Sequence, residues 1–262
     1  MMIDGKTRTL GLLGDPVEHT MSPLIHNTLS EKLGLNNVYV PFHTKAENLE
    51  AAVKGAYALN ILGLNVTVPH KNEVMQYLSE LDEGGQAIGA VNTLVRIENG
   101  YKGYNTDMMG LLREVRSYGV ELDGQDVIIL GAGGAAKAVA YMCVSNGAGH
   151  VYILNRTVAK AQAIADHMND FFGNQSMTAM SIQDYHKLPE KKYIVFQSTS
   201  KGLYPHSDEV VIEDPAFYKL VSVGIDLIYK PFSTGFMSLC RYAGPDIYEA
   251  IARRYLNIGC SV

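Results

Sequence analysis

A lysine and an aspartate that lie far apart in the sequence form its most reactive combination. Lys71 follows the polar segment Asn65–Pro69, and Asp107 ends the run Asn105-Thr106-Asp107. If the two side chains meet, they suit carbonyl reduction, because hydride arriving at carbon leaves negative charge on oxygen that an ammonium group can stabilise and protonate. The carboxylate would orient the ammonium group. Taken separately, Lys71 is typical of a solvated surface charge, and Asp107 of a helix cap.

Amide and hydroxyl side chains accompany this pair and suit a polyhydroxylated ring acid. In an extended strand, Asn65 and Thr67 point to the same face, and Asn92 adds another amide. Thr20 and Ser22 begin an expected helix, where hydroxyl and backbone N–H groups together would bind a carboxylate. A simple N-cap at Ser22 is the alternative.

A glycine-rich turn predicts a dinucleotide site. The run Gly131-x-Gly133-x-x-Ala136 follows the apolar segment Val127–Leu130 and opens a helical pattern. The glycines allow a tight turn and close approach of a pyrophosphate to the helix N-terminus. An ordinary strand-to-helix turn is the alternative. The cofactor-binding candidates here are Gly131, Ala132, Gly133, Gly134 and Ala135.

The next expected strand indicates which cofactor the turn would bind. It ends in Asn155-Arg156-Thr157, with Lys160 one turn further, where an NAD enzyme carries an acidic residue for the ribose hydroxyl. A planar Arg can stack on adenine and bind a 2′-phosphate, with Thr157 and Lys160 as further donors. Cations at a helix start are mildly unfavourable without a bound anion. The pattern therefore favours NADP over NAD.

Alternating apolar strands and amphipathic helices predict an α/β fold that positions these groups. We expect two domains separated by a cleft. Residues 1–107 would form an N-terminal α/β substrate domain, completed by residues 239–262, and residues 108–238 a Rossmann-type dinucleotide-binding domain. Expected strands include Thr9–Leu13, Val38–Phe42, Gly63–Val66, Asn92–Ile97, Val127–Leu130, His150–Leu154, Tyr193–Phe196 and Val221–Asp226. Helices are expected near Glu47–Ala58 and Lys71–Tyr77.

Composition supports a globular protein that acts on small molecules. The 262 residues are 47% hydrophobic and carry a net charge of −5, with basic residues scattered along the chain. A nucleic-acid or membrane partner is therefore not indicated. The three cysteines form no CxxC pair, and no metal-binding spacing occurs among the eight histidines. We expect a cytoplasmic monomer or homodimer without a metal site.

Several segments, in this order, resemble the shikimate dehydrogenase family over about residues 9–243. The resemblance implies an NADP-dependent oxidoreductase that interconverts 3-dehydroshikimate and shikimate in aromatic amino-acid biosynthesis. It also implies that Lys71 and Asp107 are the catalytic pair and that Thr20 and Ser22 hold the carboxylate. Asn65, Thr67, Asn92 and Tyr229 would then surround the ring, and Thr199 would lie beside the cofactor. The matching segments are Gly14–Asn27, Asn65–Lys71, Gly89–Thr93, Asn105–Asp107, Gly131–Ala136, Asn155–Thr157, Gln197–Ser200 and Asp226–Tyr229.

Two departures from the family pattern leave alternatives open. Thr20 stands where the family has Ser, so a quinate/shikimate or aminoshikimate dehydrogenase is an alternative. After Gly244 the family's Gln-bearing helix has no match, which also fits a weakly active paralogue that binds NADP and a ring acid. Pro245 is expected to start a helix that packs on the first domain.

Overall fold

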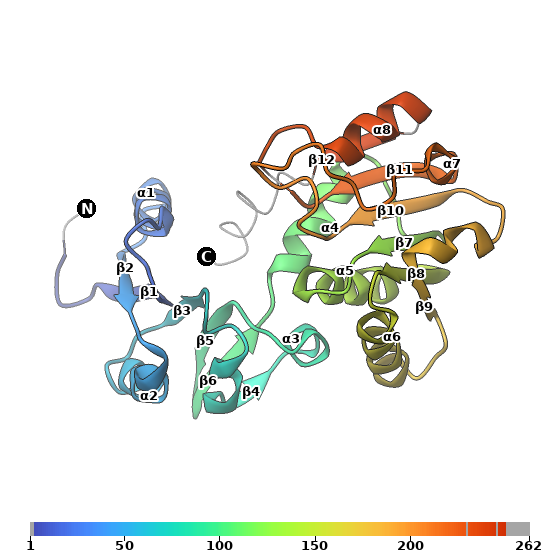
Figure 1. Cartoon of the computed structure of the whole chain (residues 1–262). Helices are drawn as coiled ribbons and strands as arrows, with labels where there is room; N and C mark the ends of the chain where they lie inside the picture. Colours follow the sequence, from blue (N-terminus) through green and yellow to red (C-terminus); the bar gives the residue numbers. More distant parts are fainter. Residues whose placement is uncertain (1–2, 229, 245, 250–262) are drawn as a thin grey trace. The chain divides into compact units, whose positions relative to one another are not determined.

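The computed structural model describes residues 3–228, 230–244 and 246–249, and the chain divides into two compact units between Asp107 and Met108. Each unit contains its own six-stranded sheet (Figure 1). We call them the substrate unit and the dinucleotide unit, and we describe each by itself. The expected α/β architecture with two domains is confirmed.

The substrate unit contains six strands, three α-helices and two 3₁₀ helices within its described residues. They are β1 (Arg8–Gly14), α1 (Ser22–Lys32), β2 (Asn37–His43), η1 (Ala46–Asn48), α2 (Leu49–Ala58), β3 (Gly63–Val66), η2 (Glu73–Tyr77), β4 (Glu80–Leu81), α3 (Glu83–Ile88), β5 (Thr93–Ile97) and β6 (Gly100–Tyr104).

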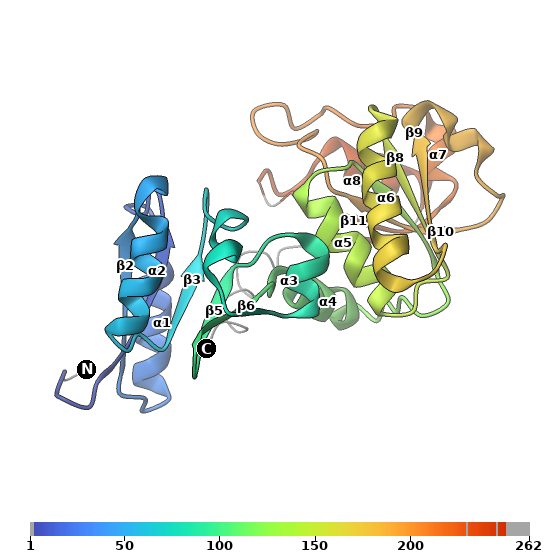
Figure 2. The same cartoon turned by 90° about the horizontal axis from the view of Figure 1, so that it is seen from below.

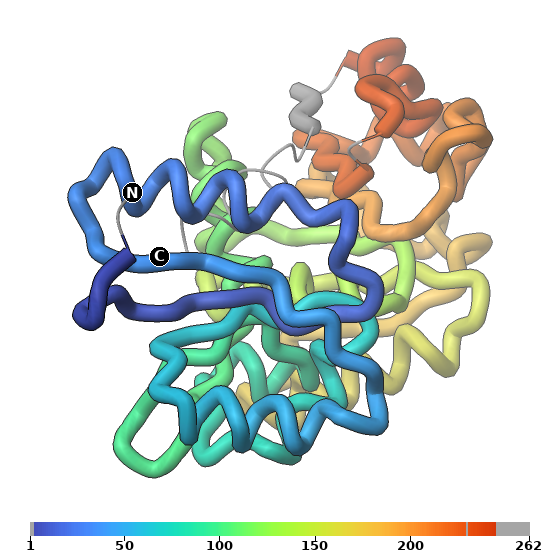
Figure 3. The backbone as a smooth tube through the Cα atoms, turned by 90° about the vertical axis from the view of Figure 1, so that its left-hand side faces the viewer, coloured from blue at the N-terminus to red at the C-terminus, as the bar shows by residue number. Residues whose placement is uncertain are grey.

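Its sheet has the order β2-β1-β3-β5-β6-β4. β1 is parallel to β2 and β3, whereas β5 is antiparallel to β3 and β6. In Figure 3, α1 and α2 lie on opposite sides of β1 and β2. Alternation along β1 explains this arrangement, because Leu12 packs with Tyr39 on one face and Leu13 joins Leu49 and Leu64 in the main core.

The dinucleotide unit contains a second set of alternating strands and helices. They are α4 (Asp107–Ser117, of which Asp107 belongs to the substrate unit), β7 (Asp126–Leu130), α5 (Gly134–Ser145), β8 (His150–Asn155), α6 (Val158–Phe172), β9 (Met177–Ser181), η3 (Ile182–Lys187), β10 (Tyr193–Gln197), α7 (Pro215–Tyr218), β11 (Val221–Asp226), α8 (Gly235–Ala243) and β12 (Asp246–Glu249).

Its sheet is parallel throughout, in the order β12-β11-β10-β7-β8-β9. This is the doubly wound order, in which the connections reverse direction between β7 and β10. Helices α5 and α6 contact β7–β9, and α8 contacts β11 and β12. Figure 2 shows α6 against β8 and β9. Strand β7 is apolar and fully buried from Val127 to Leu130, as expected for the centre of such a sheet.

The structure differs from the sequence-based expectation after residue 238. We expected residues 239–262 to complete the substrate domain, but α8 and β12 belong to the dinucleotide unit. The segment after Pro245 was expected to be helical, yet Asp246–Glu249 is a strand paired with β11. Pairing with an open sheet edge outweighed the weak helical pattern there. The remainder of the predicted tail lies outside the described residues.

The structure also differs from the prediction at two local features. The expected helix Lys71–Tyr77 is a shorter 3₁₀ helix, η2, because the chain turns at Pro69 and His70 before it begins. Ser22 is the first residue of α1 and Met21 is the cap, with no side-chain hydrogen bond to the cap. The Ser22 hydroxyl therefore is not used as a simple N-cap.

Candidate active site

Lys71 and Asp107 meet in the substrate unit. Lys71 Nζ lies 2.8 Å from Asp107 Oδ2, and the two side chains are 30% and 17% exposed. Asp107 is the first residue of α4, and the Lys71 carbonyl accepts a hydrogen bond from Val91 N at 2.8 Å. Partial burial weakens the competition from water, so this ion pair is held more firmly than one on an open surface.

Asn92 links the carboxylate to the surrounding hydroxyl groups. Its Nδ2 donates to Asp107 Oδ1 at 3.0 Å. Its Oδ1 accepts from the hydroxyl groups of Thr93 and Thr106 at 3.1 and 3.0 Å and from Thr106 N at 3.0 Å. Because donors occupy one end of the amide and an acceptor faces the other, its orientation is fixed, and it holds the second oxygen of Asp107 in place.

Asn65 extends this network through Tyr39, which was not predicted from the sequence. Asn65 Nδ2 donates to Thr93 Oγ1 at 3.3 Å, and Asn65 Oδ1 accepts from the Tyr39 hydroxyl at 2.8 Å. Tyr39 is 3% exposed and stacks on His26 with ring centroids 4.2 Å apart. Burial raises the pKa of Tyr39 well above its usual value, so the hydroxyl stays a donor. A tyrosine that is buried needs a polar partner for its hydroxyl group, and a tyrosine in a predicted strand was the available signal.

Thr20 and Ser22 lie together at the start of α1. The Thr20 hydroxyl donates to Ser22 Oγ at 3.1 Å, and Ser22 N donates to Thr20 Oγ1 at 3.2 Å. The uncapped N-terminus of α1 and two hydroxyl groups are thus available at one place for an anion.

Thr67 and His70 shape the chain that leads to Lys71. Thr67 N donates to Leu13 O at 2.9 Å, and the Thr67 methyl would contact any side chain at Gly14. His70 is 1% exposed, and its Nε2 lies 2.6 Å from Thr44 O. His70 was not among the residues predicted from the sequence, although a histidine beside the reactive lysine was a visible signal.

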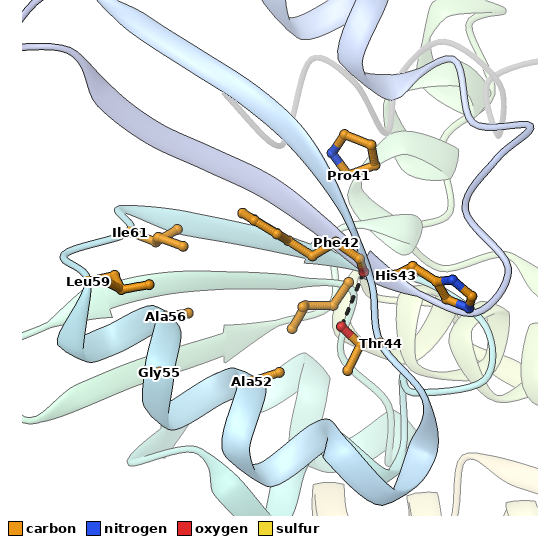
Figure 4. A pocket seen from close by; sticks show the side chains of 10 residues that line it. Pro41, Phe42, His43, Thr44, Ala52, Gly55, Ala56, Leu59 and Ile61 are labelled. Carbon is orange, nitrogen blue, oxygen red and sulfur yellow. Dashed lines mark hydrogen bonds between the residues drawn. The ribbon is translucent and has the colours of Figure 1, made fainter.

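A separate hollow lies between α2 and β2 (Figure 4), with a volume of about 450 Å³. Its walls are mostly apolar, and the Thr44 hydroxyl in its wall donates to Phe42 O at 3.2 Å. None of the substrate-binding candidates that the structure describes lines it. This hollow is therefore separate from the Lys71–Asp107 network.

In the dinucleotide unit, the glycine-rich turn follows β7 at the sheet's switch point. Gly131 has φ +110°, a conformation that favours glycine. Gly133 caps α5 without a side-chain hydrogen bond, and a Cβ at Gly133 or Gly134 would meet nothing within 4 Å. Ala136 is fully buried against the sheet. Open space over free N–H groups fits the phosphates of a dinucleotide.

The end of β8 presents the predicted phosphate-binding cations. Arg156, Thr157 and Lys160 are exposed, and Asn155 Nδ2 donates to Thr157 O at 2.9 Å. The first turn of α6 contains no acidic residue. An arginine and a lysine at a helix N-terminus without a compensating acid fit a bound 2′-phosphate.

Thr199 lies in the turn after β10, within the part of this unit that borders the glycine-rich turn. A Cβ on Gly131 would lie 2.8 Å from Thr199 Cγ2. Tyr229, the remaining predicted substrate residue, lies outside the described residues.

Comparisons with known proteins identify the family. Residues 12–94 match the model of the shikimate dehydrogenase substrate-binding domain, and residues 113–216 match that of shikimate/quinate 5-dehydrogenase. The chain is 42% identical over 251 residues to the shikimate dehydrogenase (NADP(+)) of Caldanaerobacter subterraneus subsp. tengcongensis, covering 93% of this chain and 86% of that protein. The chain belongs to the shikimate dehydrogenase family.

Solved structures agree with the family assignment. A crystal structure of a shikimate dehydrogenase in complex with NADP+ is 34% identical and matches with a TM-score of 0.82, covering 99% of this chain and 90% of that one. The Listeria monocytogenes shikimate 5-dehydrogenase in complex with shikimate and NAD is 28% identical, with a TM-score of 0.87 over 97% and 89% of the two chains. As a family member, the chain is an NADP-dependent oxidoreductase of the shikimate dehydrogenase type. Within the described residues, no helix has the length and apolar character needed to cross a bilayer.

Proposed function

We propose that this chain reversibly reduces 3-dehydroshikimate to shikimate with NADPH, using Lys71 and Asp107 as its catalytic pair. The observation that carries the proposal is the 2.8 Å contact between Lys71 Nζ and Asp107 Oδ2 within a network of amide and hydroxyl groups. Bound NADPH supplies the hydride. Lys71 stabilises the developing alkoxide and delivers a proton to it, and Asp107 orients the ammonium group.

The other polar residues of the network bind and orient the ring acid. Thr20 and Ser22 bind its carboxylate at the start of α1, supported by the hydrogen bond between their hydroxyl groups. Asn65, Thr67, Asn92 and Tyr229 bind the ring hydroxyl groups. The geometric support is that Asn65 and Asn92 share Thr93 as a hydrogen-bond partner, so their side chains form one polar surface.

On the dinucleotide unit, the segment Gly131–Ala135 would hold the pyrophosphate, and Arg156, with Asn155, Thr157 and Lys160, the 2′-phosphate. Thr199 would lie beside the cofactor. We place the enzyme in the cytoplasm, as a monomer or homodimer acting on small molecules.

The experiment is a substrate panel with both cofactors. We would follow the oxidation of NADPH and NADH with 3-dehydroshikimate, and the reduction of NADP+ and NAD+ with shikimate, quinate and aminoshikimate. The highest kcat/KM is expected with the shikimate pair and NADP(H). Binding of NADPH and shikimate by calorimetry without any turnover would instead favour the weakly active paralogue. A higher kcat/KM with quinate would move the assignment to the quinate branch and implicate the extra methyl group of Thr20.

A further inference from the structure

Three strand ends of the dinucleotide unit meet at Gln197. In the parallel sheet, Gln197 pairs with Leu130 of β7 on one side and with Asp226 of β11 on the other. The glycine-rich turn follows Leu130, the Thr199 turn follows Gln197, and the loop that leads to α8 follows Asp226. Gln197 is therefore the last residue of the strand between the two others, at the carboxyl edge where doubly wound sheets bind ligands.

Gln197 is buried, with only 1% of its surface exposed, and both ends of its side-chain amide form hydrogen bonds. Its Oε1 accepts from Thr199 N at 2.6 Å and from the Thr199 hydroxyl at 2.7 Å. Its Nε2 donates to Lys201 O at 2.9 Å and, at a longer 3.4 Å, to Asp226 Oδ1. A flipped amide would place its oxygen against two acceptors and its nitrogen against two donors, so these contacts select one orientation.

Asp226 is itself held in place on the far side of the amide. It is fully buried, and its Oδ1 accepts from Ile228 N at 2.9 Å, while its Oδ2 accepts from the Thr234 hydroxyl at 2.6 Å. Thr234 caps α8 by accepting from Met237 N. The carboxylate is thus a fixed point anchored to β11 and α8, against which the Gln197 amide is oriented.

The segment that contains Thr199 packs directly against the glycine-rich turn. A Cβ on Gly131 would lie 2.8 Å from Thr199 Cγ2 and 3.0 Å from Ser198 Oγ. The Ser198 hydroxyl donates to Leu130 O at 2.7 Å. A displacement of Thr199 therefore changes the wall against which the Gly131 turn is packed.

We propose that Gln197, oriented by the buried carboxylate of Asp226, is a positioning residue for NADP(H) that holds Thr199 against the glycine-rich turn. It acts through Thr199. The inference rests on the proposed NADP-binding function. It adds Gln197 and Asp226, which are buried beneath the proposed cofactor-binding site. Its consequence is that cofactor affinity depends on a buried amide that belongs to neither the glycine-rich turn nor the phosphate-binding cations.

The first test replaces Gln197 by an apolar residue of similar shape. In the full chain, Gln197→Met removes both hydrogen bonds to Thr199, and we expect the Kd for NADPH, measured by its fluorescence, to rise about tenfold, or about 1.4 kcal/mol. The KM for shikimate should change less than about twofold. Lost stability alone would lower the fraction of folded protein without changing the Kd of the molecules that remain folded.

A matched control is the buried amide Asn169 of α6, in the same unit. It is 6% exposed, and its Nδ2 and Oδ1 bond to Met177 O and N at 3.1 and 3.0 Å. Asn169→Leu should lower Tm and leave the Kd for NADPH unchanged. Comparing the two variants separates the loss of a buried amide from the loss of the Thr199 contact.

Gln197→Glu gives a second readout in which the positioning role depends on pH. The introduced carboxyl group can still accept from Thr199, but it must share a proton with Asp226, because two adjacent carboxylates do not both ionise readily. Cys240, a buried residue of α8, also interacts with Asp226, and burial raises the pKa of its thiol to about 12. Lys201 is paired with Glu209 at 2.6 Å.

The variant's Kd for NADPH, divided by the wild-type Kd at the same pH, should be near unity at acidic pH and rise about tenfold by alkaline pH. An unchanged Kd in Gln197→Met, or a ratio in Gln197→Glu that does not vary with pH, would overturn the positioning role. A wild-type chain that does not bind NADPH in the same titration would overturn the proposed function instead.

Discussion

The two units build their polar surfaces from different chemical groups: mainly side chains in the substrate unit and mainly backbone N–H groups in the dinucleotide unit. In the substrate unit, side chains bond to side chains, from Tyr39 through Asn65 and Asn92 to Asp107, and Thr20 bonds to Ser22 in a separate pair. In the dinucleotide unit, the candidate phosphate-binding site consists mainly of backbone at Gly133 and Gly134. Exposed cations lie at the end of β8, and the buried amide is that of Gln197. A side-chain network selects a particular ligand shape, whereas backbone N–H groups at a helix start suit any phosphate of the right placement.

The largest expected effect is at Lys71, in the side-chain network. Lys71→Met keeps the length of the side chain but removes the ammonium group, so kcat should fall by at least about 1,000-fold. The Kd for NADPH should stay the same, because the residue belongs to the other unit. The control is Lys102→Met, since Lys102 is also 30% exposed and paired to an acid, Glu80. Substantial turnover in Lys71→Met would remove the residue from the chemistry.

Asp226 tests the buried part of the dinucleotide unit through its pH dependence. Burial raises its pKa from 3.8 to about 6, although hydrogen bonds from Thr234 and Ile228 N oppose the shift. The folded state then holds the proton more tightly than the unfolded state, so this group's contribution to stability falls as pH rises from about 4 to 6 and stays low above that. Asp226→Asn cannot ionise.

Relative to wild type, the Asp226→Asn variant should therefore gain unfolding free energy between about pH 4 and 7, by up to about 2–3 kcal/mol. Urea unfolding at a series of pH values measures this difference. A difference that is constant across the range would show that Asp226 has an ordinary pKa in the folded protein.

Arg156 tests the exposed cations at the edge of the same unit. Arg156→Ala should weaken NADP+ binding about 10- to 50-fold, because a charge-assisted contact to the 2′-phosphate is lost. NAD+ binding should weaken less than about threefold, since NAD+ has no such phosphate. Arg116→Ala, which removes an exposed arginine paired with Glu121, serves as the control. Equal losses for both cofactors would contradict the phosphate assignment.

The smallest effect is expected at Tyr39, a member of the network that does not carry the chemistry. Tyr39→Phe keeps the ring stacked on His26 but leaves Asn65 Oδ1 without its donor. The KM for shikimate should rise about fivefold, with little change in kcat. Tyr101→Phe, which removes another buried hydroxyl bonded to Ile61 O at 2.7 Å, should cost stability and leave KM unchanged. An equal KM change in both variants would mean that Tyr39 only supports packing.

Turns, strands and other features that depend only on residues adjacent in the sequence could be predicted from the sequence itself. Gly131–Ala136 after an apolar strand predicted the strand-to-helix turn, and Asn155–Thr157 with Lys160 predicted cations at the next helix start. Most strand positions followed from short apolar runs bounded by turn residues, and β3 and β11 have the predicted bounds. These patterns need no partner distant in the chain.

The tertiary structure decided which distant residues meet. Lys71 and Asp107 contact one another because β3 and β6 flank the antiparallel strand β5, so that the segments after β3 and β6 lie at the same edge of the sheet. From the sequence alone, the pair was reactive only if the two side chains met. Tyr39 and Gln197 acquired roles only from residues of other strands, Asn65 and Asp226, and the segment after Pro245 became a strand because the edge of β11 was available. Sheet pairing and burial depend on residues far apart in sequence, so spacing along one stretch of chain carries no information about them.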